Sequence, residues 1–391
     1  MSRRTKVFAG MCLVGAGTVG VYIYHAKTRN AVEPAPSAAT PAPAESSSPE
    51  PQSPQAEAAA SGAAESTTTA PSSSVASTEA VPPPANPAPA APKKPHANAL
   101  APKQVFFRYN GVDGHYGKVA YVDPRKPDAP VFVDTLSCEV VYVAGGSGLC
   151  LIAKRGIITT YSAKLFDATT FETRSQFAIN GVPSRGRVSR DGRIAAFTVF
   201  VAGHGYTSLD FSTQTLLVDT TTGTTIADLE TFAITRDGKP FKEADFNFWG
   251  VTFTPDTKAF YATLSSGGQH YLIRGDIESR TAKVIHSNVE CPSLSPDGTR
   301  VAYKKRFVVD GRILWELHVV DLATDKEISL QEKRSVDDQL EWLDANTVLY
   351  SVPETENDTS PSTDVWMTAA DGKSGDPKIF LHRAFSPAAV R

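Results

Sequence analysis

Four carboxylates lie beside two apolar segments and are candidates for a binding or catalytic site. Asp337, Asp338 and Glu341 stand close together, and Glu290 precedes the segment that starts at Cys291. Carboxylates that meet on the wall of a channel can hold a cation or a basic peptide. Asp337 and Asp338 fit a turn better, because short acidic side chains bond to their own backbone there.

Basic residues form a second candidate group. Arg185 and Arg187 stand on one predicted strand, and Lys304, Lys305 and Arg306 end another. At the mouth of a channel these side chains would attract an anion. Alternation along a strand turns Lys305 away from its two neighbours, so the run is not one patch. Charged strand ends that prevent edge pairing are the plainer interpretation.

Other chemical signals in the sequence are weak. Trp249, within the sequence FNFWG at 246–250, suits either a protein-binding hot spot or packing in the core. The sequence contains neither G-x-S-x-G nor H-E-x-x-H, which are motifs of α/β-hydrolases and zinc peptidases. Residues 203–205, GHG, are too short to cradle a phosphate. We therefore expect no catalytic residue, no metal ligand and no bound cofactor.

The elements that must position these residues are short strands joined by a repeated turn. Residues 295–303 read SPDGTRVAY, residues 188–197 read VSRDGRIAAF, and residues 253–261 read FTPDTKAFY, with a weaker copy at 342–350. Pro presets φ, Asp bonds back to the backbone, and Gly accepts a positive φ. Each copy therefore predicts a tight turn between two strands.

A second repeat is an apolar strand that ends in an aspartate. The copies are spaced by about 44 to 57 residues and end at Asp123, Asp167, Asp219, Asp276 and Asp321, with a related copy before Asp371. Repeats of this length are typical of the four-stranded blades of a propeller.

Six such units fit the chain, at residues 105–133, 139–179, 185–230, 250–285, 291–330 and 339–381. The first unit lacks an inner strand, and residues 385–391 resemble the start of one. We expect this C-terminal segment to complete the first blade and close the ring. Closure removes exposed sheet edges.

The S-P-D-G-x-x-h-A-h pattern at 295–303, where h is apolar, resembles the PD40 (WD40-like) repeat of TolB-like six-bladed β-propellers. The resemblance covers residues 104–391 and is strongest at 291–306. It implies an all-β propeller and an exported protein with an address in the cell envelope, and it does not imply a reaction. The sequence departs from the family in its anchor-like start, its long linker and its lack of the α/β domain that precedes the propeller there.

The cysteines of the propeller allow one disulfide. Cys138 and Cys150 flank the inner hairpin of the second predicted blade. A two-residue turn near Ser147 would place Cys150 opposite about Val143, so a disulfide needs an irregular start to that strand. Cys291 belongs to the fifth unit, across the tunnel and too far away for a disulfide. A Cys138–Cys150 disulfide and buried free thiols remain alternatives.

The N-terminal third differs in kind from the rest. Residues 1–6 carry three basic side chains, and residues 7–24 carry no charge, which is just long enough to span a bilayer. We expect residues 1–30 to be an uncleaved signal anchor, a single transmembrane helix with its N-terminus inside. A cleaved secretory signal is the alternative. Residues 31–102 are rich in Pro, Ala and Ser and predict a disordered linker.

These features predict an anchor at 1–30, a linker at 31–102 and a propeller at 103–391. The anchor places the protein in the inner membrane, with the propeller in the periplasm or another extracytoplasmic space. If the N-terminal segment is cleaved, the protein is secreted instead. A formal net charge of -3 gives no reason to expect nucleic acid as a partner.

The expected function is non-enzymatic binding of an envelope protein or peptide by a face of the propeller. The candidate tunnel or face residues are Arg185, Arg187, Trp249 and Glu341. One alternative is an enzyme that acts on envelope glycan or peptide through a tunnel-mouth carboxylate such as Glu341. Another is a sensor of a small ligand. Propellers host many functions, so the fold alone does not decide between these.

Overall fold

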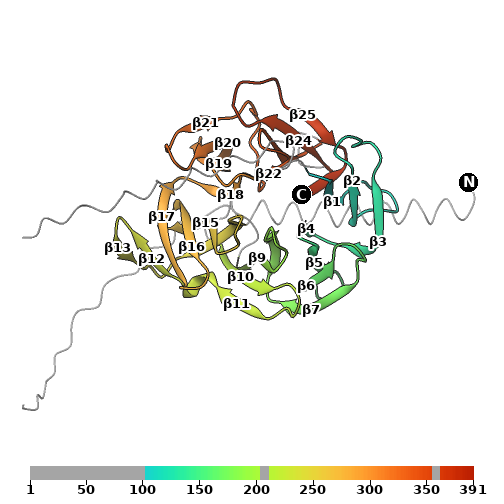
Figure 1. Cartoon of the computed structure of the whole chain (residues 1–391), viewed down its shortest axis with the longest axis horizontal. Coiled ribbons are helices and arrows are strands. Elements are labelled where there is room, and N and C mark those ends of the chain that lie inside the picture. The colour runs from blue at the N-terminus through green and yellow to red at the C-terminus, as the bar shows by residue number, and fades with distance from the viewer. Residues whose placement is uncertain (1–101, 203–210, 355–361) are drawn as a thin grey trace, which may run out of the picture. The chain divides into compact units, whose positions relative to one another are not determined.

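The computed structural model describes residues 102–202, 211–354 and 362–391. These residues form six sheets around a common centre (Figure 1). The predicted anchor, and the predicted linker except for Pro102, lie outside the described residues. Within the described ranges, no helix is long and apolar enough to cross a membrane. The predicted all-β, six-bladed propeller is confirmed.

Each blade contains four antiparallel strands, which we number from the inner strand outwards. Blade one consists of β26 (Ala384–Val390), β1 (Gln104–Tyr109), β2 (Lys118–Val122) and β3 (Val131–Ser137). Blade two consists of β4 (Val140–Ala144), β5 (Ser147–Lys154), β6 (Thr160–Asp167) and β7 (Thr173–Ile179). Blade three consists of β8 (Val182–Val188), β9 (Ile194–Ala202), β10 (Ser212–Asp219) and β11 (Thr225–Asp228), and the 3-10 helix η2 (Leu229–Thr231) follows it.

The second half of the ring repeats this arrangement. Blade four consists of β14 (Asn247–Phe253), β15 (Ala259–Ser266), β16 (Gln269–Asp276) and β17 (Thr281–Ser287). Blade five consists of β18 (Glu290–Leu294), β19 (Arg300–Val309), β20 (Arg312–Asp321) and β21 (Glu327–Ser329). Blade six consists of β22 (Glu341–Trp342), β23 (Thr347–Pro353), β24 (Thr363–Ala369) and β25 (Lys378–Leu381).

The ring closes as the sequence predicts. The C-terminal strand β26 pairs with β1, with Ala389 opposite Val105 and Ala388 opposite Phe106. The inner strands β4, β8, β14, β18, β22 and β26 contact one another in turn, and the last of them also contacts the first. The strand missing from blade one therefore comes from the other end of the chain.

One hairpin of the structure was not predicted. β12 (Ala233–Arg236) and β13 (Lys239–Phe241) extend blade four, where β12 runs parallel to β17. Asp237 and Gly238, at the turn, have φ angles of 52° and 72°. A two-residue Asp-Gly turn of this kind is a strong hairpin signal, so the sequence carried the information. Ile234 from this hairpin packs into the core beside Phe248.

The repeated turn is held by its own side chains. Ser189, Thr254 and Ser295 each donate a hydroxyl proton to the aspartate two residues further on, at 2.7, 2.7 and 2.5 Å. The same aspartates accept a backbone N–H from the second residue beyond them. The strand-ending aspartates act similarly: backbone N–H groups of Thr170 and Thr169 lower the pKa of Asp167 to about 2. Because these bonds are local, each turn can form within its own blade and the same short motifs can recur from blade to blade.

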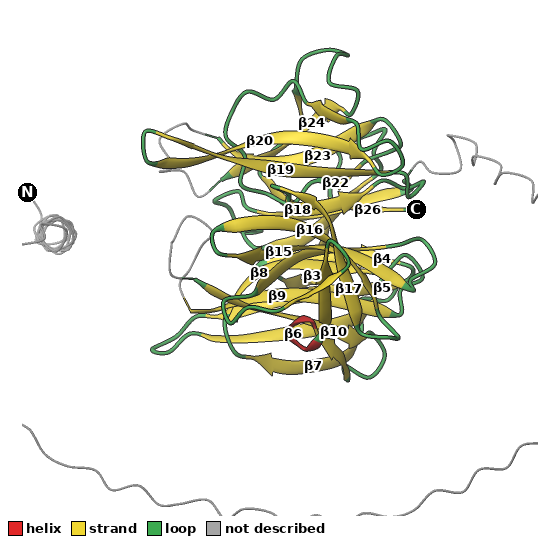
Figure 2. Ribbon diagram, turned by 90° about the vertical axis from the view of Figure 1, so that its left-hand side faces the viewer, coloured by secondary structure: helices red, strands yellow, loops and turns green. Residues whose placement is uncertain are grey.

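The two ends of the ring differ in their connections (Figure 2). We call "turn face" the end with the turns between first and second strands, such as residues 189–193 and 295–299. We call "hairpin face" the opposite end, with the connections between second and third strands, such as residues 155–159 and 310–311. The hydrophobic core lies between neighbouring blades: Phe197 of blade three packs with Leu149 of blade two.

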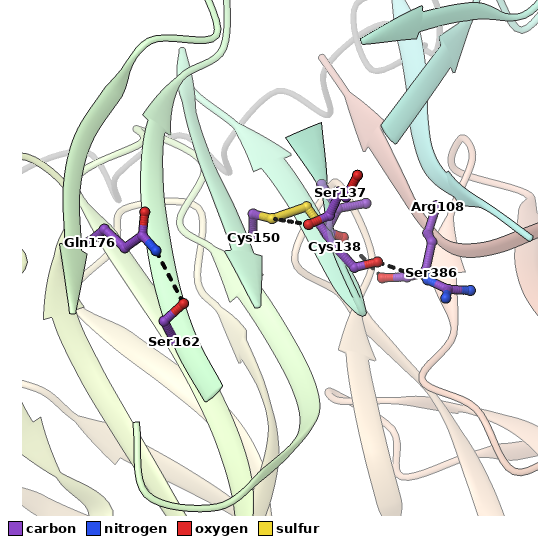
Figure 3. The surroundings of a disulfide bond; sticks show 8 residues. Arg108, Ser137, Cys138, Cys150, Ser162, Gln176 and Ser386 are labelled. Atoms are coloured by element: carbon purple, nitrogen blue, oxygen red, sulfur yellow. Dashed lines mark hydrogen bonds between the residues drawn. A yellow bond between two sulfur atoms is a disulfide. The ribbon is translucent and has the colours of Figure 1, made fainter. Parts of the chain in front are cut away.

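Cys138 and Cys150 form a disulfide, with an S–S distance of 2.00 Å and a Cα–Cα distance of 5.3 Å (Figure 3). The turn of this hairpin is Gly145-Gly146, so Cys150 lies opposite Val141 instead of Val143. Cys138 stands just outside the regular strand, in the irregular start that a disulfide requires. The Arg108 side chain donates a 2.8 Å hydrogen bond to the Cys138 carbonyl (Figure 3). The disulfide thus fastens blade two where the chain enters it from blade one.

Candidate functional site

Arg187 and Glu341 form an ion pair across the centre of the ring. Arg187 comes from β8 in blade three and Glu341 from β22 in blade six, which are opposite blades. The two residues are 5% and 2% exposed. Because an isolated buried charge is costly, such a pair is stable only when its remaining donors and acceptors are also satisfied.

The surrounding residues supply those partners. Arg187 donates to the Tyr142 hydroxyl at 2.7 Å, to Ser293 Oγ at 3.0 Å and to the Leu340 carbonyl at 2.6 Å. Tyr142 in turn donates to Glu341 at 3.0 Å. Burial raises the pKa of Tyr142 to about 12, so its hydroxyl stays protonated and remains a donor. We call this set the tunnel plug: Tyr142, Arg187, Ser293, Leu340 and Glu341.

A second buried network lies around Lys304 of β19. Lys304 pairs with Asp337, lies 3.7 Å from Glu290, and stacks its ammonium 4.2 Å from the centroid of the Trp315 ring. Lys304 and Glu290 are fully buried. Burial acts to lower the pKa of Lys304, but the neighbouring groups Asp337, Cys291 and Glu290 together outweigh it, and the pKa is raised. The ammonium therefore stays charged inside the protein.

Further contacts complete this network. Glu290 accepts the indole N–H of Trp315 at 3.0 Å. Asp337 lies 3.3 Å from Arg185. Asp338 accepts the backbone N–H groups of Gln339 and Ser351 at 2.8 Å each, and burial raises its pKa. Asp338 therefore accepts hydrogen bonds from the backbone, as an aspartate in a turn does.

The structure pairs the acidic and basic residues that the sequence suggested as separate sites. Arg187 meets Glu341, and Arg185 meets Asp337. The four carboxylates do not converge on one open site, and no group of three or more His, Cys, Asp or Glu side chains among the described residues is placed to hold a metal ion. Trp249 is fully buried and packs with Cys291 and other core residues, which corresponds to the packing alternative.

The plug separates two recesses. The larger, of about 90 Å³, opens on the turn face and has Arg187, Glu341 and Tyr142 as its floor. The smaller, of about 30 Å³, lies on the other side of the plug and is lined by residues that include Arg185 and Asp338. The sequence did not reveal these recesses, because they depend on which side chains of opposite blades meet.

Exposed apolar side chains gather on the hairpin face. Eight of the ten exposed large hydrophobic residues among those described lie on connections between second and third strands or on the ends of these strands. They are Val112, Tyr116, Ile157, Ile158, Val201, Val308, Val309 and Leu314. Ile157 and Ile158 are 108% and 79% exposed. The other two, Val131 and Ile379, lie on outer strands.

The hairpin of β19 and β20 projects furthest from its sheet (Figure 2). From Lys305 and Glu316 to Val309 and Arg312 the two strands pair only with each other. The Asn288 side chain bonds to both the backbone N–H and the carbonyl of Arg306 at 3.1 Å. The edge of β19 that faces away from β20 is therefore occupied within the chain at Arg306.

Comparisons with known proteins agree with this architecture. No family model and no curated protein matches the chain. Among solved structures, TolB from Acinetobacter baumannii has 17% sequence identity and a TM-score of 0.50, over 74% of this chain and 67% of that one. A chain of the nidogen/laminin complex has 11% identity and a TM-score of 0.47, over 73% of this chain and 97% of that one. The described part of this protein has a six-bladed β-propeller fold that is similar to that of TolB.

Proposed function

We propose that the propeller is a non-enzymatic binding domain that presents its hairpin face to a protein or peptide partner in the cell envelope. The observation that carries this proposal is the gathering of eight exposed apolar side chains on that face. Apolar groups that cluster on one side of a soluble domain indicate an interaction surface. Ile157 and Ile158 are the most exposed of these side chains together with Val112, and they are the strongest candidates for direct contact with a partner.

The tunnel chemistry supports binding over catalysis. An enzyme that used Glu341 would need this carboxylate within reach of a substrate. Instead, Glu341 is bonded to Arg187 and Tyr142 in the buried plug. Glu290 is fully buried beside Lys304, and the partly exposed Asp337 is paired with Lys304 and Arg185.

The binding proposal is tested with residues 102–391, which contain all six blades and their cores. Affinity capture from solubilised envelope, with identification by mass spectrometry, should recover a specific protein. The double variant Ile157→Ser/Ile158→Ser should lose that protein about tenfold or more, because each buried side chain of this kind contributes about 1.5–3 kcal/mol. The matched control Val131→Ser/Ile379→Ser removes two exposed apolar residues elsewhere and should retain it. Equal capture by both variants would contradict a role for the hairpin face.

The proposed address is the cell envelope, with the propeller outside the cytoplasm. The charge-free run at 7–24 after a basic start supports a membrane anchor, and residues 31–102 would act as the spacer. The full chain should remain with membranes after alkaline extraction, and a chain that starts at residue 102 should be released. Release of the full chain by the same extraction would favour the cleaved form.

A further inference from the structure

Two Asn-Gly pairs lie in the described part of the chain, and their surroundings differ. They are Asn110-Gly111 and Asn180-Gly181, and a valine follows each of them. In such a pair the backbone nitrogen of the glycine can attack the side-chain amide of the asparagine, because no Cβ hinders its approach. The reaction needs an amide that can turn toward this nitrogen. A free pair is therefore reactive, and a pair held by hydrogen bonds is protected.

Asn180 and Gly181 form the whole connection between blade two and blade three. They stand between β7, which ends at Ile179, and β8, which begins at Val182. Asn180 is exposed to solvent. Within the described ranges, neither the Asn180 side-chain amide nor the Gly181 N–H takes part in a hydrogen bond. The amide of Asn180 is therefore free to turn toward the Gly181 nitrogen.

The fold requires glycine at position 181. Its φ angle of 148° is one that residues with a side chain rarely adopt. A Cβ at this position would also lie 2.4 Å from the carbonyl oxygen of Phe200 in the neighbouring strand β9. A bulkier residue, which would slow the attack on Asn180, therefore cannot replace Gly181 unless the start of blade three moves.

Asn110 has the opposite setting. It is 2% exposed. Its side-chain amide donates to Thr363 Oγ1 at 2.6 Å, and its side-chain oxygen accepts from Ser362 Oγ at 3.3 Å. Its backbone N–H donates to the Arg383 carbonyl at 2.9 Å. Both ends of this amide are engaged, so Asn110 is a matched control within the same molecule.

We propose that Asn180 is a site of spontaneous deamidation, with water as the second reactant. The Gly181 nitrogen bonds to Cγ of Asn180, and the bond from Cγ to Nδ2 breaks. Nδ2 leaves as ammonia with the proton of the Gly181 N–H, and a five-membered succinimide ring remains. Water then opens this ring at either carbonyl and yields aspartate or isoaspartate. The sequence of steps needs no oxidant and no reductant.

The product changes both the charge and the length of the connection. Either form places a carboxylate on the hairpin face, because Ile179 pairs with Tyr161 at the end of β6 next to the connection at 155–159. Isoaspartate also adds a carbon atom to the main chain. Its two neighbours are anchored, since Ile179 lies in the core between blades two and three, and Val182 packs against the cluster that contains Trp249. The modification goes beyond the proposed function and does not depend on it.

The test incubates the full chain under native conditions at mildly alkaline pH. Peptide mapping by mass spectrometry follows the replacement of the side-chain amide by a carboxyl group at both pairs. A protein isoaspartate methyltransferase, supplied with labelled S-adenosylmethionine, marks the isoaspartate form. Asn180 should deamidate about tenfold or more faster than Asn110, because the hydrogen bonds of the Asn110 amide must break before that residue can react.

Two further measurements show whether the fold and this residue are responsible. In denaturant, both pairs should react at similar rates, because only the fold distinguishes them. Asn180→Gln should remove the methyl label from this peptide, because glutamine forms the corresponding larger ring much more slowly. Unfolding midpoints of the variant and the wild type verify that the domain remains folded.

Two results would overturn the proposal. The first is an equal rate of deamidation at Asn110 and Asn180 in the folded protein. The second is an Asn180 that reacts in denaturant and stays intact in the folded protein, because the connection would then keep the amide and the Gly181 nitrogen apart.

Discussion

Glu341→Ala lowers the free energy of unfolding of the propeller by about 3–5 kcal/mol, the usual cost of breaking a buried ion pair. The substitution leaves the Arg187 guanidinium, 5% exposed, without its carboxylate. Tyr142, Ser293 and the Leu340 carbonyl still accept hydrogen bonds from Arg187, but they carry no charge. Arg187→Ala should also destabilise the domain, because it leaves the buried Glu341 with only the Tyr142 hydroxyl and a longer ion pair to Arg391. Urea unfolding measures both variants.

The double variant Arg187→Met/Glu341→Leu separates the loss of the pair from the loss of packing. Apolar residues of similar volume often replace a buried ion pair with little change in stability, so this variant should be more stable than either single variant. Arg193→Ala, which breaks an exposed pair, should leave the midpoint nearly unchanged. A Glu341→Ala domain that unfolds at the same urea concentration as the wild type would show that the plug does not hold the blades together.

Cys138→Ser/Cys150→Ser should lower the free energy of unfolding by about 2–4 kcal/mol, the range typical of a native disulfide. The bond closes a short loop, with a sequence separation of 12. The disulfide also holds blade two close to blade one, and blade one is the sheet in which the first and last strands of the propeller pair. Loss of the disulfide should therefore weaken the ring near the point where it closes. Urea unfolding of the double variant and the wild type measures the effect.

A reductant provides the control for the disulfide. It should lower the midpoint of the wild type toward that of the double variant, and it should leave the double variant unchanged. An unchanged wild-type midpoint, after a thiol assay has confirmed reduction, would rule out a stabilising role.

Much of the fold could be predicted because its repeated turns are formed by residues that are neighbours in the sequence. The turn at 295–299 contains its own hydrogen bonds: the carboxylate of Asp297 accepts from the Ser295 hydroxyl and from the backbone N–H of Thr299. Similar turns recur at about the length of a blade, so the blade order follows from the sequence. Ring closure follows from a first blade that lacks one strand. The β12–β13 hairpin carries a comparable Asp-Gly turn, but it lies between two units of the repeat, so the repeat pattern does not predict it.

The site could not be predicted in the same way. Arg187 and Glu341 are 154 positions apart in the sequence, and their contact depends on the position of two strands in opposite blades. The sequence indicated that basic and acidic residues would reach the tunnel. Only the structure shows that these opposite charges pair with each other, because no local sequence pattern relates the two strands.

Exposed apolar residues are the other feature that the sequence concealed. Ile157 and Ile158 follow an apolar strand and resemble part of its core pattern. Their position in a connection on the hairpin face exposes them to solvent. Burial depends on where a strand ends, and strand ends are poorly defined by periodicity.

The most direct test of the central claim is hydrogen–deuterium exchange of residues 102–391 with and without the captured partner. We expect the partner to slow exchange in the hairpins at 154–160 and 305–316, which carry Ile157, Ile158, Val308 and Val309. The turns at 189–193 and 295–299 should exchange as in the free domain. Protection confined to the turn face or to the outer strands would contradict a hairpin-face binding site.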